Sequence, residues 1–260
     1  MKRMDLQSFS LFAEKIDLRS PRHNSTIIPL KYKHLFFDLD HTIWDFETNS
    51  KECILELYES HGLRNTITPD FDAFYERYSY HNKRLWDRYH HGFIKQEDLR
   101  WKRMWYAFLD FKLGDEKLAK QLAIEYLQIL PTKKALFPYA TEVIKYLTGK
   151  GYQLHLITNG FEEVQWGKIR SCEIDQYFKE VITSEKAMSL KPHPEIFEYA
   201  LKITGAVKEE SIMIGDNLDA DIKGAMDAGL DTVFVNHIRE ETSLQPTYTI
   251  YHLQELELIF

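Results

Sequence analysis

Eight polar side chains in this sequence lie near the ends of short apolar segments and could do chemistry together. They are Asp38, Asp40, Thr42, Thr158, Asn159, Lys191, Asp216 and Asp221. Asp38 and Asp40, spaced by one residue, would repel each other and a third carboxylate from Asp216 strongly in a dry pocket, so such a cluster requires a cation. Oxygen ligands without His or Cys at metal spacing favour a hard divalent ion, and we expect Mg²⁺.

A phosphate group suits the other side chains of the set. The hydroxyl of Thr158 and the backbone N–H groups that follow it supply hydrogen-bond donors, and Lys191 supplies positive charge. A carboxylate nucleophile, a cation, a hydroxyl and an ammonium around one phosphoryl group form a phosphoryl-transfer site. Each segment alone is also typical of an ordinary turn or linker, so the interpretation depends on their agreement.

The elements that must position these residues are alternating strands and helices. Apolar runs predict strands at His34–Leu39, Tyr152–Thr158, Phe178–Thr183, Ser211–Gly215, Thr232–Val235 and Tyr248–Ile250. Helical periodicity predicts helices at Tyr139–Lys150, Phe161–Ser171, Pro194–Thr204 and Asp219–Ala228. This alternation is typical of an α/β fold with a doubly wound parallel sheet, whose ligands bind at the carboxyl ends of the strands.

A long helical segment interrupts this alternation between the first two strands. Helical periodicity runs from Phe46 to Leu130, with breaks at Gly62, Pro69, Gly92 and Gly114. We therefore expect a core domain at residues 31–45 and 132–260, a cap of four or five helices at residues 46–131, and a loosely ordered extension at residues 1–30. The aromatic side chains of the cap could stack a nucleobase, although helix packing is their commoner use, and His90 and His91 indicate a solvated helix end.

Composition excludes several classes of protein. With 33 Lys and Arg against 40 Asp and Glu, the net charge of −7 gives no basic surface for a nucleic acid polymer. No apolar segment is long enough to span a membrane, and the charged N-terminal segment is not a secretory signal. Two cysteines are too few for a disulfide framework, so we expect a cytoplasmic protein.

The order DxDxT, then TNG after an apolar run, then KP, then GDNxxxD resembles the four motifs of the haloacid dehalogenase-like (HAD) hydrolase superfamily. The resemblance covers about residues 33–250. It implies a Rossmann-like core, and the helical segment after the first motif resembles the inserted C1-type cap of subfamily I. On the same resemblance, the activity would be Mg²⁺-dependent hydrolysis of a phosphomonoester.

The resemblance also implies a role for each residue. Asp38 would attack phosphorus and form an aspartyl-phosphate, and Asp40 would protonate the leaving oxygen and later deprotonate the hydrolytic water. Lys191 would neutralise charge on the nucleophile and on the transferred group. Thr42 and Thr158 would hold the loop after the first strand and a phosphate oxygen, and the backbone N–H of Asn159 would lie near the phosphate. Mg²⁺ would be bound by Asp38, the Asp40 carbonyl and Asp216. Asp221 would support Lys191 or the outer metal shell.

His41 stands where many relatives carry glycine. A positive φ at this position would cost a histidine about 1 kcal/mol or more. We interpret the histidine as a tolerated variation, because the nucleotidase-like branch of the family also lacks this glycine.

Three segments favour one substrate class within this family. Asn82–Trp86, Leu156–Phe161 and Pro246–Ile250 resemble the noncanonical pyrimidine 5′-nucleotidase branch of subfamily IA. This resemblance implies a nucleoside 5′-monophosphate as the small-molecule substrate. The alternatives are a phosphatase of phosphoglycolate or a sugar phosphate, or a phosphomutase on the same core, and less favoured are a haloacid dehalogenase and a non-enzymatic binding protein.

Overall fold

The structure is a computed structural model that describes residues 31–260. The extension predicted at residues 1–30 lies outside the described residues. The elements are β1 (His34–Phe37), α1 (Phe46–Ser60), α2 (Leu63–Thr66), α3 (Phe71–His90), α4 (Gln96–Asp110), α5 (Glu116–Ile129), α6 (Ala140–Gly149), β2 (Gln153–Thr158), α7 (Glu162–Ser171), β3 (Phe178–Thr183), α8 (Ser184–Ala187), α9 (Pro194–Thr204), β4 (Ser211–Gly215), a π-helix (Leu218–Lys223), α10 (Gly224–Asp227), β5 (Asp231–Val235), β6 (Tyr248–Ile250) and α11 (Leu256–Ile259).

The predicted doubly wound sheet is confirmed. Six strands lie in the order β3-β2-β1-β4-β5-β6, and every neighbouring pair is parallel. The short strand β1 is buried along its whole length, because strands pair with both of its edges and helices cover both faces of the sheet. The sheet order reverses at β1, so β1 and β4 flank the switch point where ligands of such folds bind.

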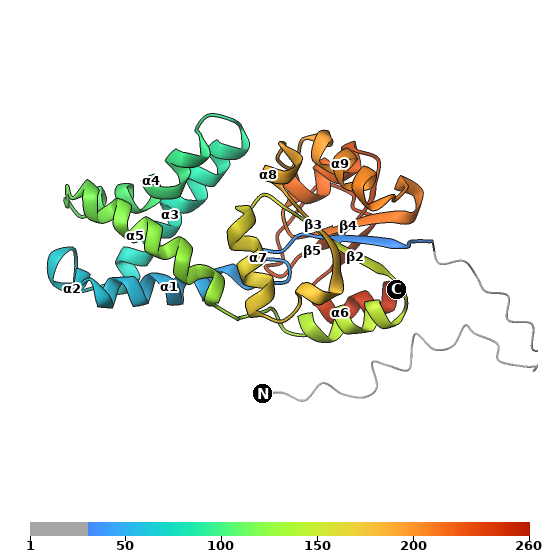
Figure 1. The fold of residues 1–260 in the computed structure, drawn as a ribbon, viewed down its shortest axis with the longest axis horizontal. Helices are drawn as coiled ribbons and strands as arrows, with labels where there is room; N and C mark the ends of the chain where they lie inside the picture. The colour runs from blue at the N-terminus through green and yellow to red at the C-terminus, as the bar shows by residue number, and fades with distance from the viewer. Residues whose placement is uncertain (1–30) are drawn as a thin grey trace, which may run out of the picture. The chain divides into compact units, whose positions relative to one another are not determined.

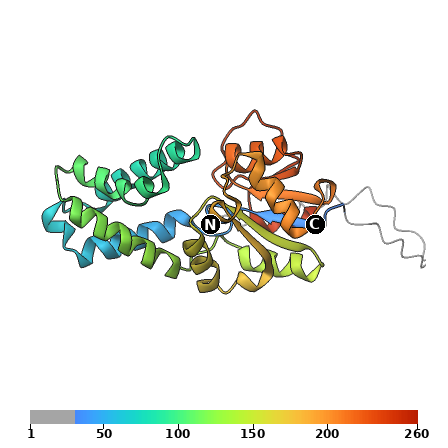
Figure 2. The same ribbon diagram turned by 45° about the horizontal axis from the view of Figure 1, so that its top comes forward.

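Helices cover the two faces of this sheet (Figures 1 and 2). Alternate residues of a strand point to opposite faces, so Phe36 packs with α9 residues such as Phe197, whereas Leu35 and Phe37 belong to a second apolar cluster with α6. The C-terminal helix α11 lies against α6, where Tyr139 donates a hydrogen bond to Glu257 at 2.9 Å. Helices therefore pack on both faces of the sheet and hold its strands in place.

Helices α1 to α5 follow β1 and pack against one another, and α6 lies between them and β2 in the chain (Figure 1). The five helices agree with the sequence prediction, and each predicted break falls between two of them. The carboxylates of Asp45, Asp70 and Asp115 accept backbone N–H groups at the starts of α1, α3 and α5. Among the described residues, no helix combines the length and apolar character needed to cross a membrane.

The helix predicted at Asp219–Ala228 is wrong in its first half. A π-helix, Leu218–Lys223, precedes the short α10, because the N–H groups of Asp221 and Ile222 both donate to the Asn217 carbonyl, at 2.9 and 3.1 Å. The Asn217 side chain caps this turn by accepting the N–H groups of Asp219 and Ala220. Such widened turns are frequent at functional sites, and this one positions Asp221.

Candidate active site

Side chains from three adjacent strand ends and one loop meet at the carboxyl edge of the sheet. Asp38 follows β1, Thr158 ends β2 and Asp216 follows β4, and these strands are neighbours in the sheet. The loop between α8 and α9 carries Lys191 to the same place, where Asn159 accepts the Lys191 backbone N–H at 2.8 Å. The sheet order therefore gathers groups that are far apart in the sequence.

Lys191 links the parts of this site. Its ammonium donates to Asp38 Oδ1 at 2.6 Å, to Asp221 Oδ1 at 2.6 Å and to the Ile157 carbonyl at 2.7 Å. Burial alone would lower the pKa of Lys191, but the carboxylates of Asp221 and Asp38 outweigh burial and raise it. Lys191 is only 2% exposed, so it is a fixed positive charge in a dry environment.

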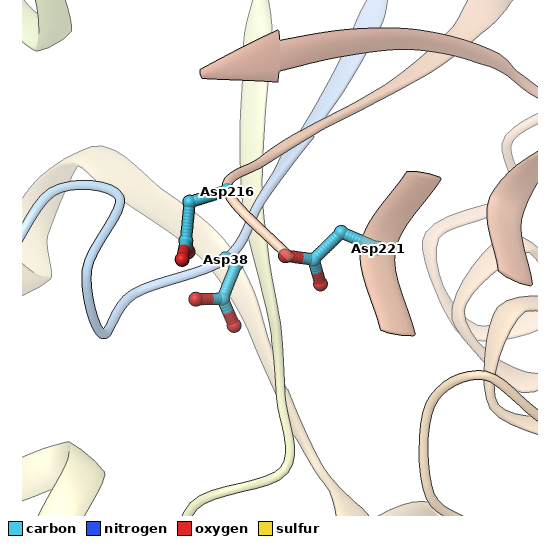
Figure 3. Close-up of side chains that lie close together, drawn as sticks. All are labelled: Asp38, Asp216 and Asp221. Atoms are coloured by element: carbon cyan, nitrogen blue, oxygen red, sulfur yellow. The ribbon is translucent and has the colours of Figure 1, made fainter. Parts of the chain in front are cut away.

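The carboxyl groups of Asp38, Asp216 and Asp221 lie close together at this edge of the sheet (Figure 3). One oxygen of each of Asp38, Asp216 and Asp221 lies within 4.8 Å of the others. Burial raises the pKa of Asp38 well above its usual value, and burial followed by the charge of Asp221 raises the pKa of Asp216 to about 7. The crowding is that of a site suited to a hard divalent cation, which would offset the negative charge.

Two contacts orient the acidic side chains that follow β4. The Thr42 hydroxyl donates to Asp216 Oδ1 at 2.9 Å, which ties the loop after β1 to the end of β4. Asp221 Oδ2 accepts the Asn217 N–H at 3.0 Å and lies against Gly215, where an added Cβ would come within 2.3 Å of it. A side chain at Gly215 would displace the buried Asp221 carboxylate.

The Asn159 side chain binds the loop that carries Lys191. Its side-chain amide donates to the Lys191 carbonyl at 2.8 Å and accepts the Lys191 N–H, so the side chain fixes the lysine loop. The neighbouring Thr158 hydroxyl accepts the Gly160 N–H at 3.1 Å and a Gln165 amide N–H at 2.6 Å. Thr158 keeps its own hydroxyl hydrogen for a further acceptor.

Asp40 lies in a tight loop between β1 and α1. The Ile43 and Trp44 N–H groups both donate to the Leu39 carbonyl, and His41 has a φ of 63°. The positive φ considered from the sequence is therefore present, at a cost of about 1 kcal/mol for a histidine. The loop turns the Asp40 carboxylate toward α7, where the side chain is 24% exposed.

Two side chains on α7 that the sequence did not single out hold Asp40. Lys168 Nζ lies 2.6 Å from Asp40 Oδ1 and 2.8 Å from Oδ2, and Gln165 donates to Asp40 Oδ2 at 3.0 Å. Both α7 side chains are buried, Lys168 at 2% exposure and Gln165 at 0%. Their only sequence signal is the i, i+3 spacing of two polar residues in the helix after Thr158, a pattern that surface helices also show.

His90 is the last residue of α3, and the prediction of a solvated helix end is wrong for its ring. The His90 Nε2 atom is buried, and no residue of the described range 31–260 bonds to it. Burial, followed by the positive charge of Lys191, lowers the pKa of His90 to about 4, so the ring is neutral at pH 7. One turn earlier, Trp86 stacks on Phe161 with ring centroids 5.6 Å apart. The C-terminal end of α3 therefore contacts the start of α7.

Comparison with known proteins agrees with this geometry. The profile of a family described as haloacid dehalogenase-like hydrolase matches residues 32–229. The pyrimidine 5′-nucleotidase PynA of Streptococcus pneumoniae is 33% identical over 228 residues, which cover 86% of this chain and 93% of that protein. A glyceraldehyde 3-phosphate phosphatase of Pyrococcus abyssi is 32% identical and covers 79% of this chain, with 82% of its own length matched.

Solved structures show the same fold. The putative HAD-hydrolase YfnB from Bacillus subtilis, crystallised with bound magnesium, has a TM-score of 0.80 at 28% identity and covers 88% of this chain and 98% of its own. The L-2-haloacid dehalogenase from Xanthobacter autotrophicus has a TM-score of 0.68 at 16% identity, with 88% of this chain and 98% of that one covered. The second likeness concerns the fold alone.

Proposed function

Since this chain belongs to the haloacid dehalogenase-like hydrolase family, we propose that it is a Mg²⁺-dependent phosphatase of small phosphomonoesters, with nucleoside 5′-monophosphates as the favoured substrates. The observation that carries the proposal is the contact of Asp38 with Lys191 beside Asp216, at the switch point of the sheet. A buried carboxylate held by an ammonium, next to further carboxylates that suit a cation, is the arrangement that phosphoryl transfer to a carboxylate requires.

The donor set fits magnesium. Asp38 and Asp216 offer carboxylate oxygens, and the Asp40 backbone carbonyl is the third protein ligand that we propose. Asp221 is the weakest candidate ligand, because its two oxygens already accept Lys191 and the Asn217 N–H. When bound, the ion would neutralise negative charge on the carboxylates and on the phosphate oxygens.

The residues then have distinct tasks in our proposal. The free oxygen of Asp38 attacks phosphorus and forms an aspartyl-phosphate while the P–O bond to the leaving group breaks, and Asp40 gives its proton to the departing oxygen. Asp40 next takes a proton from the water that attacks phosphorus and restores Asp38. Lys191 and Thr158 orient the nucleophile and bind phosphate oxygens through N–H and O–H groups.

Two features support a phosphatase over a haloacid dehalogenase on the same fold. A dehalogenase needs no acid two residues after its nucleophile, whereas Asp40 is present and is held by three hydrogen bonds. The curated relatives at 32–33% identity are named as phosphatases of a nucleotide and of a phosphorylated aldehyde. We therefore favour phosphomonoester hydrolysis, with glyceraldehyde 3-phosphate and other sugar phosphates as the second substrate class.

Cap side chains support nucleotides as the favoured class. Trp86 stacks on Phe161, which follows the Thr158–Gly160 turn, and His90 Nε2 has no hydrogen-bond partner among the described residues. A nucleobase offers π surface and polar edges to such side chains, whereas a three-carbon phosphate offers no π surface. Specificity for nucleotides would therefore arise in the cap.

A phosphate-release screen with Mg²⁺ tests the proposed function. We expect wild-type protein to release phosphate fastest from nucleoside 5′-monophosphates among nucleotides, sugar phosphates and phosphoglycolate, and Asp38→Asn to lose at least about 1000-fold of the rate. Asp227→Asn is the control, because Asp227 lies on the surface of α10 and bonds only to Lys223. Wild-type rates in Asp38→Asn would contradict the nucleophile, and a flat substrate profile would contradict the nucleotide preference.

A further inference from the structure

The contacts of Asp40 with α7 go beyond the family motifs, in which neither Lys168 nor Gln165 takes part. Lys168 places one ammonium across both carboxylate oxygens, at 2.6 and 2.8 Å. Gln165 Nε2 joins Asp40 Oδ2 to the Thr158 hydroxyl, at 3.0 and 2.6 Å. Both Asp40 oxygens are therefore bonded by one helix, and the same helix is bonded to the end of β2.

We propose that Lys168 and Gln165 are positioning residues, which hold the Asp40 carboxylate in the orientation for proton transfer to and from the reacting oxygen. This proposal rests on the proposed function, because it assigns the residues a role in the chemistry of that site. A carboxylate bonded at both oxygens cannot rotate freely, so its proton is presented in one direction, and misorientation of a catalytic group is costly in rate.

The surroundings of Lys168 confine it to this contact. The rings of Trp44 and Phe46 lie 4.4 and 5.7 Å from the ammonium, and the side chain is 3% exposed. Burial of a lysine is unfavourable unless its charge is compensated, and Asp40 is the carboxylate that compensates it here. The two aromatic rings offer no hydrogen-bond acceptor of ordinary strength, so the ammonium donates its hydrogen bonds to Asp40.

Gln165 is confined equally closely. An added Cβ at Gly160 would lie 2.4 Å from the Gln165 side chain, so the glycine after Asn159 makes the space that this side chain occupies. The Gln165 NH₂ group donates to Asp40 Oδ2, which turns the carbonyl oxygen of the same amide away from Asp40. The Gln165 carbonyl oxygen is consequently buried without a partner in the described part of the chain, and the contact with Asp40 is kept despite that cost.

The ammonium also suits the charge that develops on Asp40. Asp40 enters the first step with the proton that it took from the hydrolytic water of the preceding turnover. When it donates this proton to the leaving oxygen and the P–O bond breaks, its carboxylate becomes negative beside Lys168. The cation stabilises that charge as it forms, and the carboxylate then accepts a proton from the attacking water. Lys168 stays an ammonium in both steps, so protons and charge balance between Asp40, the leaving group and water.

The experiment compares two leaving groups at saturating Mg²⁺. The nucleoside of a 5′-monophosphate would leave as an unstable alkoxide, so its departure needs a proton. The leaving group of 4-nitrophenyl phosphate is a stable phenolate, so its departure needs little general acid catalysis. For Lys168→Met we expect kcat/KM to fall about 100-fold on the nucleotide and less than about 10-fold on 4-nitrophenyl phosphate, because general acid catalysis typically contributes about 100- to 10,000-fold. Lys168→Arg should restore part of the loss.

Further variants separate positioning from a structural role. Lys186→Met is the control, because Lys186 lies at the surface and pairs with Glu180, and we expect both substrates to be unaffected. Gln165→Met should show the same substrate selectivity with a smaller loss, and it tests the proposal if Lys168→Met does not fold. In an Asp40→Asn background, Lys168→Met should cost less than about 3-fold more, because the residue acts through Asp40.

The other possible results contradict either the positioning role or the proposed function. Equal losses of Lys168→Met on both substrates, faster turnover, or additive losses with Asp40→Asn would overturn the positioning role. An inactive wild-type protein on both substrates would instead contradict the proposed function and leave no positioned reaction. The leaving-group comparison therefore distinguishes failure of the positioning role of Lys168 and Gln165 from failure of the phosphatase assignment.

Discussion

Lys191 uses all of its ammonium N–H donors in hydrogen bonds within the protein. An ammonium has three N–H donors, and those of Lys191 go to Asp38, Asp221 and the Ile157 carbonyl. No donor is left over, so a phosphate oxygen that reaches Lys191 must share or replace one of these acceptors. The residue is at once a structural link between two buried carboxylates and a candidate contact for substrate.

Removal of this charge should therefore destabilise the fold as well as the site. Lys191→Met leaves the buried carboxylates of Asp38 and Asp221 without their cation, and we expect a loss of about 3–5 kcal/mol in the free energy of unfolding. Lys186→Met removes an exposed ion pair and should cost less than about 1 kcal/mol. Urea denaturation measures both, and equal stability of the two variants would contradict the structural role of Lys191.

At the scale of elements, strand β2 ends at the candidate site and carries a titratable histidine in its interior. His155 lies mid-strand at 1% exposure, where its Nε2 is 3.1 Å from His34 Nδ1 and its ring stacks on Phe36. Burial, followed by the nearby His34 and Lys179, lowers the pKa of His155 to about 4. The fold therefore prefers the neutral imidazole at this position of the sheet.

Acid should weaken the sheet through this strand. The folded pKa of His155 lies below the usual value near 6.5, so its stabilising contribution is present above pH 6.5 and is lost as the pH falls toward 4. Between pH 7 and pH 5 we expect wild-type protein to lose about 2 kcal/mol more stability than His155→Gln, which can still bond to His34. Urea denaturation at both pH values tests this, with His91→Gln as an exposed control, and equal losses in wild type and His155→Gln would contradict it.

At the scale of the whole molecule, the sheet order concentrates negative charge at one edge. Asp38 lies far in the chain from Asp216 and Asp221, and among the bonds described the Lys191 ammonium pairs with Asp38 and Asp221. Burial and the crowding of these carboxyl groups raise the pKa of Asp38 and of Asp216. Folding therefore brings the acidic groups together at an electrostatic cost, which a bound cation would offset.

Magnesium should stabilise the folded protein even without substrate. A ligand at ten times its Kd adds about 1.4 kcal/mol to folding, which corresponds to about 3–6 °C in Tm for a chain of this size. We expect this shift for wild-type protein in a thermal melt and a much smaller one for Asp216→Asn, with NaCl of equal ionic strength as the control. An unchanged wild-type Tm, or an equal shift in the variant, would contradict a cation site at these residues.

Much of the fold followed from local patterns. The strands at Phe178–Thr183, Ser211–Gly215 and Tyr248–Ile250 and the helix at Pro194–Thr204 have the predicted bounds, because buried runs and helix starts are signalled by neighbouring residues. The family prediction is confirmed by the profile match. The π-helix after Asn217 was not predictable, because its backbone bonds depend on how Asp221 packs against Gly215 and Lys191.

The sequence by itself determined which groups carry charge and which strand ends they follow, since residue type and apolar periodicity are local properties. It could therefore indicate the acidic cluster and Lys191. Only the tertiary structure decided that Lys168 and Gln165 hold Asp40 and that the His90 Nε2 atom at the end of α3 is buried. A buried lysine or histidine is identical in sequence to a solvated one, and the difference arises when packing between distant segments removes water from one of them.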